Sequence, residues 1–355
     1  MKRTLFNLIP DLYQNFLPDF FETPAPSEKV ANCHDCIKTK PTEEVRYSTK
    51  SKCCTYYPTT PNYLVGAILT DSRQELDFAR QVIRDSIKSR LGVSPVGLMP
   101  PRKYKFLYDH TDSFFGRSES MICPYLNPET QECSRWRYNE ATCISYFCVN
   151  EAGIDGSNFW KSFKEHLNTV ETTLSQYALH QLNMNKSFIN QQYKNDTQMK
   201  QLTGLDLDNK PHPTDIYQSL WGDFEGNEEA FYIKCYELVR QLTAEDFTRL
   251  RSDKLHEKFN TMLNNFTLLS MPKVPQVLQP NPDMQLIQLA DNKCKAYTQQ
   301  GTYEFSNTLH DVIQFFDGKS SNEDVCNRIK IEKGMVLSQQ LIVALYRNQT
   351  LVAAR

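Results

Sequence analysis

The stretch SKCCTYYPTTPNYLVGAI, residues 51–68, places two cysteines side by side ahead of an aromatic run that prolines interrupt. Neighbouring cysteines rarely form a disulfide with each other, because the bond requires a particular separation and direction of the two side chains. A plain core gives little reason to pair them either. Cys53 and Cys54 therefore have to be interpreted together with the other cysteines of the chain.

The cysteines are unevenly distributed along the sequence. Three of them, Cys235, Cys294 and Cys326, are isolated, and Cys235 falls within an apolar helical pattern that predicts a buried free thiol. The other eight precede residue 150. These candidate metal ligands are Cys33, Cys36, Cys53, Cys54, Cys123, Cys133, Cys143 and Cys148.

Composition and charge are those of a globular protein. The chain has 355 residues, of which 40% are hydrophobic and 23% charged, enough for at least one sizeable core. The formal net charge of -2 gives no reason to expect nucleic-acid binding as the main task, since that task usually needs a basic excess. No run of about 18 apolar residues is present, so no membrane span is predicted.

The first residues, MKRTLFNLIPDLYQNFLPDFFE, lack the continuous apolar segment and the small-residue cleavage site of a secretion signal. We expect them to belong to the mature protein and to pack on its body. Without such a signal the expected compartment is the reducing cytoplasm, where structural disulfides are rare. The side chains expected to pack are Leu5, Leu8, Leu12, Phe16 and Phe20.

The spacing of the cysteines predicts metal binding. Cys33 and Cys36 form a C-x-x-C pair, and two thiolates at that spacing can reach one ion from a single turn. Two four-cysteine zinc sites and iron–sulfur clusters, most simply of the 4Fe–4S type, account equally well for eight thiols. Side chains of adjacent residues diverge in an extended backbone, so we expect Cys53 and Cys54 to serve two metals or separate irons of one assembly.

The chain as a whole predicts an α+β fold. Residues 1–150 read as a cysteine-cluster metal-binding domain with little regular structure, 151–270 as a helical region, 271–283 as a proline-rich linker, and 284–355 as a winged-helix-like domain. Within the first region we expect a helix over 71–92, a loop and short strand over 93–109, and two extended pieces around NPETQ. Ser157 is the expected cap of the first long helix of the second region.

The segments CHDC, KCCTYYP and CPYLNPETQECSRWRYNEATCISYFC resemble the bacterial cysteine-cluster family with a C-x-x-C-x-x-C-C signature. That family is described as zinc- or iron-chelating, and flagellin lysine N-methylase, thought to carry an iron–sulfur cluster, is similar to it. The resemblance implies metal binding by the eight cysteines. The chain departs from the family in the 16 residues between Cys36 and Cys53 and in an ending without R-P, which leaves the reaction open.

The last region resembles the small winged-helix domains of peptide-modifying systems, like the peptide chaperone of pyrroloquinoline quinone biosynthesis. The segments that carry this resemblance are LHDVIQFFDGKSSNEDVCNRI and LSQQLIVALYRNQTLV. Such a domain binds a peptide by adding it as a strand to a sheet edge. A helical cap packed on the rest of the protein is the structural alternative.

Together these patterns predict an iron–sulfur protein that acts in modification of a protein or peptide substrate. Tyr56, Tyr57, Tyr125 and Phe147 are expected to shield the cluster. The alternative is a zinc-stabilised protein-interaction module without catalysis, in which metal replaces core. Whether the chain is an enzyme is left open, because no acid/base pair or Ser/His/Asp arrangement can be assigned.

Overall fold

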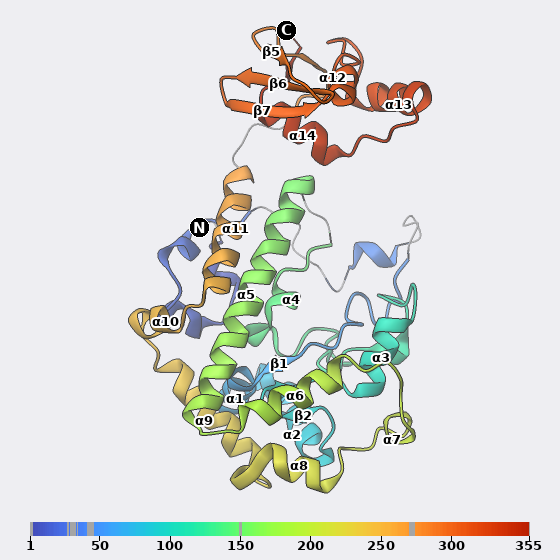
Figure 1. Cartoon of the computed structure of the whole chain (residues 1–355). Helices are drawn as coiled ribbons and strands as arrows, with labels where there is room; N and C mark the ends of the chain where they lie inside the picture. The colour runs from blue at the N-terminus through green and yellow to red at the C-terminus, as the bar shows by residue number, and fades with distance from the viewer. Residues whose placement is uncertain are drawn as a thin grey trace. The chain divides into compact units, whose positions relative to one another are not determined.

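The computed structural model describes residues 3–26, 28, 33, 35–40, 46–148, 151–269 and 274–354. The chain divides into two compact units, residues 1–269 and 270–355 (Figure 1). The regions before and after residue 150, which the sequence separates, thus lie within one unit. Helices predominate and small sheets accompany them, so the predicted α+β class is confirmed.

Helix α1 (Asn62–Thr70) lies at the centre of the larger unit. Its sequence NYLVGAILT is apolar on nearly every side, as is typical of a fully buried helix, and each residue from Asn62 to Leu69 is buried. It packs most extensively against α9 (Glu228–Arg240). The two backbones meet at Gly66, where a β-carbon would lie 1.9 Å from the carbonyl oxygen of Tyr232. Only glycine fits at this contact.

A small antiparallel sheet lies at the beginning of α1, with one strand before the helix in the chain and two strands after it. Its strands β1 (Thr60–Pro61), β2 (Val93–Ser94) and β3 (Gly97–Leu98) are arranged in the order β1-β3-β2. The buried Asn62 amide donates hydrogen bonds to the carbonyl oxygens of Pro95 (2.9 Å) and Ser175 (3.3 Å). These bonds tie the beginning of α1 both to the turn between β2 and β3 and to the long helix α5 (Gly153–Gln181).

Helix α5 (Gly153–Gln181) runs beside α11 (Asp253–Leu269) and is the longest helix in the described part of the chain (Figure 1). It begins at Gly153, so the prediction that Ser157 caps it is wrong. The helical spacing of large apolar residues predicts one apolar face that ends at Tyr177; this face is buried except for Tyr177, which is half-buried. The buried residues of that face are Phe159, Phe163, Leu167, Val170 and Leu174.

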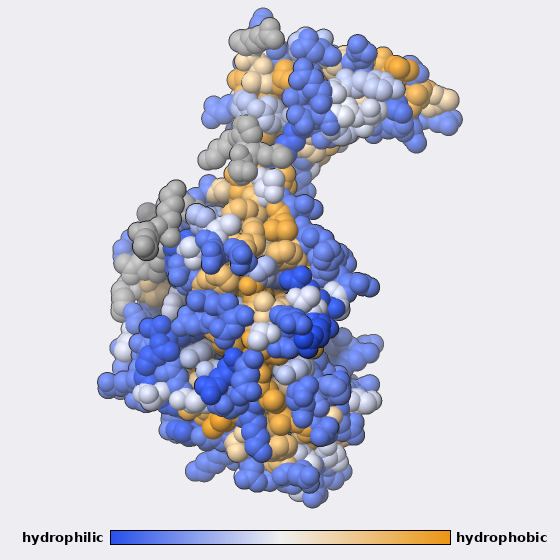
Figure 2. All heavy atoms as spheres, turned by 90° about the vertical axis from the view of Figure 1, so that its left-hand side faces the viewer, coloured by the Kyte–Doolittle hydropathy of each residue, from blue (hydrophilic) through white to orange (hydrophobic). Residues whose placement is uncertain are grey.

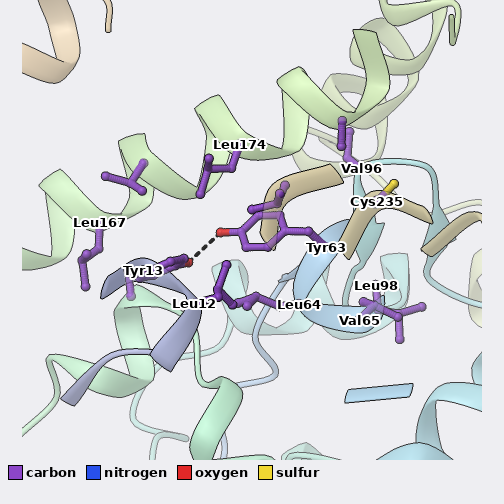
Figure 3. Close-up of a cluster of buried hydrophobic side chains, with 14 of the residues drawn as sticks. Leu12, Tyr13, Tyr63, Leu64, Val65, Val96, Leu98, Leu167, Leu174 and Cys235 are labelled. Atoms are coloured by element: carbon purple, nitrogen blue, oxygen red, sulfur yellow. Dashed lines mark hydrogen bonds between the residues drawn. The ribbon is translucent and has the colours of Figure 1, made fainter. Parts of the chain in front are cut away.

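The N-terminal segment packs into the same core, as the sequence predicts. Leu5 and Phe16 are buried there. The hydroxyl groups of Tyr13 and Tyr63 share a hydrogen bond of 2.6 Å, and Figure 3 shows this bond between the N-terminal segment and α1, with Leu167 and Leu174 of α5 alongside. The segment consists of short 3-10 turns, Phe6–Leu8, Asp11–Asn15 and Asp19–Glu22.

The predicted elements between residues 71 and 133 are partly confirmed. Helix α2 (Asp77–Ser89) lies within the expected helix, although it begins after a 3-10 turn at Gln74–Leu76. The sequence predicts a loop followed by a short strand over 93–109. The strand is wrong, because the later residues of this range form helix α3 (Arg102–His110). Pro101 precedes this helix and favours its beginning, because its ring fixes a dihedral angle compatible with a helix start. The turn at NPETQ is confirmed by the antiparallel bridge between Leu126 and Cys133.

The remaining helices of the larger unit follow α5. Capping boxes begin two of them, at Thr203 with Asp206 and at Thr243 with Asp246, which satisfies backbone N–H groups that the helices leave free. These helices, with the short α4, complete the unit: α4 (Ala141–Ile144), α6 (Lys186–Thr197), α7 (Gly204–Leu207), α8 (Thr214–Trp221) and α10 (Ala244–Leu250).

For the smaller unit the sequence predicts a strand pair, three helices and a closing strand; the helices and the closing strand are found in that order, but four strands precede them within the described residues 274–354. Residues 271–273 of the predicted linker lie outside the described residues. The later part of that linker contains strand β4, which belongs to the smaller unit because it pairs with β8. The other strands form a sheet in the order β5-β6-β7. The elements are β4 (Leu278–Pro280), β5 (Gln285–Gln288), β6 (Lys293–Thr298), β7 (Gly301–Ser306), α12 (Asn307–Ile313), α13 (Asn322–Lys333), α14 (Gln339–Arg347) and β8 (Leu351–Ala353).

Hydrophilic residues predominate on the face shown in Figure 2, and a band of apolar atoms crosses the larger unit on the side where α10 and α11 lie. In the described part of the chain, no helix combines the length and the apolar character that a membrane span needs.

The contact between α1 and α9 predicts that Gly66→Ala destabilises the protein strongly. The added methyl group meets backbone, which cannot rotate away, so we expect a loss at the upper end of the ~1–3 kcal/mol typical of overpacking. Urea unfolding followed by circular dichroism measures the change. Gly204→Ala is the matched control, since no atom lies within 4 Å of its β-carbon position. Equal stability of the two variants would contradict the assigned contact.

His166 of α5 predicts a loss of stability in acid. Its side chain is buried between the rings of Phe21 and Phe259, and neither ring nitrogen has a hydrogen-bond partner among the residues described. Burial, with a smaller contribution from the charge of Arg251, lowers the pKa of His166 to about 4. The unfolded chain binds this proton near pH 6.5, so stability falls as the pH drops from about 6.5 to about 4, by roughly 3 kcal/mol.

His166→Leu should flatten this part of the pH profile, as measured by thermal unfolding between pH 4 and pH 8. His180→Leu, which changes an exposed histidine of the same helix, should keep the wild-type profile. An unchanged acid loss in His166→Leu would show that another group titrates.

Candidate metal centre

Backbone hydrogen bonds bring the cysteine-bearing segments together. The N–H of Cys123 donates to the carbonyl of Cys54 at 2.8 Å, and the antiparallel bridge at Leu126 places Cys133 on the neighbouring piece of chain. The N–H of Ser48 donates to the carbonyl of Gly116 at 2.7 Å, which joins the segment before Cys53 to the loop before Cys123. Residues distant in sequence thus surround one region of the larger unit.

The chain at Cys53 forms a turn. Lys52 has a φ of 48°, and the N–H of Cys54 donates to the carbonyl of Ser51 at 2.8 Å. The expectation that the two thiols diverge from an extended strand is therefore wrong, because a turn brings neighbouring side chains closer. The two thiols instead lie close enough to shift each other's pKa in opposite directions.

Mutual electrostatic effects divide the eight free thiols into two neighbouring sets. Burial raises the pKa of Cys148 to about 11, and Cys53, Cys36 and Cys33 add to this shift. Burial also raises the pKa of Cys123 to about 12, with Cys133 adding to it. We assign Cys33, Cys36, Cys53 and Cys148 to the outer thiols, and Cys54, Cys123, Cys133 and Cys143 to the inner thiols, with Cys133 also interacting with Cys33 and Cys53 across the two sets.

Cys53 and Cys54 join the two sets and differ in acidity. The neighbouring Cys54 thiol lowers the pKa of Cys53 to about 7, against the effect of burial. The same proximity raises the pKa of Cys54, and burial and the charges of Cys53, Cys123 and Cys133 raise it further. Cys53 is therefore the more readily ionised thiol of the pair.

The thiols lie in one region of the larger unit, but their side chains do not converge on a single position. In the described ranges, no three histidine, cysteine, aspartate or glutamate side chains stand close enough to hold one metal ion. The donor set nevertheless suits a thiolate-binding metal, since zinc and iron–sulfur clusters are both held by four cysteines. Metal binding by these cysteines stays a prediction.

Aromatic side chains lie beside the inner thiols. The Tyr104 hydroxyl donates to the Thr55 carbonyl at 2.5 Å and accepts from the Tyr57 N–H at 2.8 Å, which fixes the chain just after Cys54. The ring of Tyr57 lies 6.3 Å from that of Tyr125, and burial, with a smaller contribution from Cys123, raises the pKa of both hydroxyl groups. Burial, with a smaller contribution from Cys143, likewise raises the pKa of Tyr56, whereas Phe147 packs 4.4 Å from Trp160 in the core.

Glu140 and Glu171 position the helix that carries Cys143. The Glu140 carboxylate caps α4 by accepting the N–H groups of Cys143 (2.9 Å) and Thr142 (2.7 Å). Glu171 of α5 accepts the N–H of Ala141 at 2.8 Å. Burial, followed by the charge of Glu140, raises the pKa of Glu171 well above its ordinary value, which favours its neutral form.

Arg135 is buried beside the inner thiols, with 1% of its surface exposed. One of its amino groups donates to Thr60 Oγ1, and the guanidinium lies 4.9 Å from the centre of the Tyr125 ring. Burial by itself would lower the pKa of Arg135, but neighbouring groups that can carry a negative charge, with Cys143 first among them, raise it above its ordinary value. Arg135 is therefore a fully charged side chain in the interior.

Sequence reasoning missed Arg135, Tyr104 and Glu140. Arg135 follows Cys133 by two residues, and the exposed Arg137 follows Arg135 by two more. Nothing in the sequence distinguishes the two arginines. The isolated cysteines behave as predicted where the sequence addressed them, since Cys235 is buried and free in α9. Comparison of the chain with family models, curated proteins and solved structures gives no match.

The two sets of thiols predict that Cys53→Ser and Cys54→Ser each lower the metal content by about half, because each removes one ligand from a different four-thiol set. Metal bound per folded chain, measured by mass spectrometry after gel filtration, tests this. Cys235→Ala is the matched control and should leave the metal content unchanged. Unchanged metal in either serine variant would contradict the division into two sets.

Proposed function

We propose that this chain is a metalloprotein that binds iron–sulfur clusters through its outer and inner thiols and acts in the modification of a protein or peptide substrate. The observation that supports the proposal is that eight free thiols, from segments up to 115 residues apart between Cys33 and Cys148, lie in one region of the larger unit and influence one another electrostatically. Scattered structural cysteines give no reason for such a grouping.

The surroundings of the inner thiols support a cluster more than a simple structural ion. Cys123 is buried, and tyrosine rings stand beside it, so solvent has little access to that set. Solvent exposure and nearby hydrogen-bond donors tune the reduction potential of an iron–sulfur cluster. When bound, such a cluster supplies one-electron transfer, and the adjacent Cys53 and Cys54 would bring two clusters close to each other.

The smaller unit supports the peptide part of the proposal. Strand β5 stands at one edge of the three-stranded sheet, every residue of Gln285–Gln288 is exposed, and Leu286 and Ile287 present apolar side chains there. An exposed sheet edge offers unpaired backbone groups to an incoming strand. A peptide substrate held at this edge is the role that the resemblance to peptide-binding winged helices implies.

One observation favours a second candidate, a zinc-stabilised interaction module without catalysis. Between residues 111 and 140, and in the described part of 28–59, regular structure is confined to short 3-10 turns. Segments with so little secondary structure commonly depend on a metal for their folding. Zinc in both thiol sets would meet that need without any redox chemistry.

Anaerobic purification of the full chain, followed by iron, zinc and acid-labile sulfide analysis, decides between the two. We expect a brown protein with broad visible absorption, and iron and sulfide in equal amounts, because clusters of the 4Fe–4S type contain both in that ratio. A colourless protein with zinc in both sets would overturn the iron–sulfur proposal in favour of the second candidate. A protein that retains neither metal would overturn both.

A further inference from the structure

Arg135 is a buried arginine without an ion pair in the part of the chain that the structure describes. The groups that the guanidinium contacts directly are neutral: the hydroxyl of Thr60, which accepts from one amino group, and the face of the Tyr125 ring. The second amino nitrogen, Nη2, is buried and has no hydrogen-bond partner in the same described residues. The guanidinium therefore keeps unused donors in the interior.

A cation in this position requires a negative partner. Removing an ion from water is strongly unfavourable unless an opposite charge and further hydrogen bonds compensate it. A lysine or a carboxylate can lose its charge when buried, but a guanidinium stays protonated in proteins. The compensation for Arg135 must therefore come from an anion beside it.

The two neighbouring carboxyl groups supply little of that compensation. Glu140 uses its oxygens to cap α4 through the N–H groups of Cys143 and Thr142. Glu171 accepts the N–H of Ala141 and is held toward its neutral form by burial. Neither carboxyl group forms an ion pair with Arg135, and neutral thiols would carry no charge to offset it.

The chain next to Arg135 leads directly to the inner thiols. The N–H of Ser134 donates to the Tyr125 carbonyl at 2.9 Å, in the same hairpin where Cys133 bridges to Leu126. Arg135 follows Cys133 by two residues, and its guanidinium lies over the ring of the residue that forms this bond, Tyr125. The charge is thus held at the inner set by backbone pairing rather than by a flexible loop.

We propose that Arg135 is a positioning residue that serves as the built-in counter-cation of the metal centre at the inner thiols. The inference rests on the proposed function. Four thiolates around a divalent cation carry a net charge of about -2, and a four-cysteine iron–sulfur cluster is likewise anionic. A fixed buried cation stabilises either centre, so Arg135 favours retention of metal in the inner set and leaves the outer set unaffected.

The test compares metal retention in full-length wild type, Arg135→Met and Arg135→Lys against increasing concentrations of a competing chelator. Arg135→Met should release about half of the metal at a chelator concentration tenfold to a hundredfold below that needed for wild type, the range seen when groups that support metal ligands are removed. Arg135→Lys keeps the charge and should release the metal later than Arg135→Met. Arg80→Met, which removes a buried arginine paired with Asp77, should retain the metal like wild type.

Combining Arg135→Met with a cysteine substitution shows which set of thiols depends on Arg135 for metal retention. In Cys54→Ser, whose inner set lacks a ligand, adding Arg135→Met should cause no further loss of metal, whereas in Cys53→Ser it should still do so. In metal-free protein, Arg135→Met should unfold at the same temperature as wild type or higher, since it removes an uncompensated buried charge. A purely structural arginine would instead lower the unfolding temperature with and without metal.

Each outcome decides the inference. Metal retention by Arg135→Met equal to that of wild type, or equal losses in both cysteine backgrounds, would overturn it and leave the proposed function standing. A lower unfolding temperature of metal-free Arg135→Met, by the same amount as in the loaded protein, would also overturn it. Wild-type protein that holds no metal would overturn the proposed function and the inference together.

Discussion

The close approach of α1 and α9 at Gly66 fixes the centre of the larger unit, and the cysteine region depends on it. The chain from Cys53 leads within ten residues into α1, whose residues are buried up to Leu69. Asn62 then ties the beginning of that helix to the turn between β2 and β3 and to α5. A segment with little regular structure of its own is thereby attached to the most rigid part of the core.

Individual backbone hydrogen bonds connect this part of the core to the other cysteine segments. The Cys123 N–H reaches the Cys54 carbonyl, and the bridge at Leu126 positions Cys133. Helix α4 carries Cys143 and rests on Glu140 and Glu171. The inner set is consequently held by the main chain and by buried polar side chains, and small changes in the core would be transmitted to it.

The sequence predicted those parts of the structure that depend on local patterns. The apolar face of α5, the turn at NPETQ and the order of the helices and the closing strand in the smaller unit all follow from periodicity or turn composition. The sequence prediction fails at PPRKYKFLYD. Prolines there indicate an interrupted chain, but they directly precede helix α3 instead. Long-range contacts such as that of Arg135 with Thr60 leave no local trace, so this part of the candidate site could not be foreseen.

The divergence expected for Cys53 and Cys54 illustrates the same limit. The expectation assumed an extended backbone, but the left-handed conformation of Lys52 closes a turn and brings the two thiols close enough to shift each other's pKa. The turn nevertheless gives the two thiols partly different partners, Cys33 and Cys148 for Cys53 and Cys123 for Cys54, with Cys133 interacting with both. Adjacent cysteines can therefore join two four-thiol sets without pointing in opposite directions, because what assigns each thiol to a set is the segment packed against it.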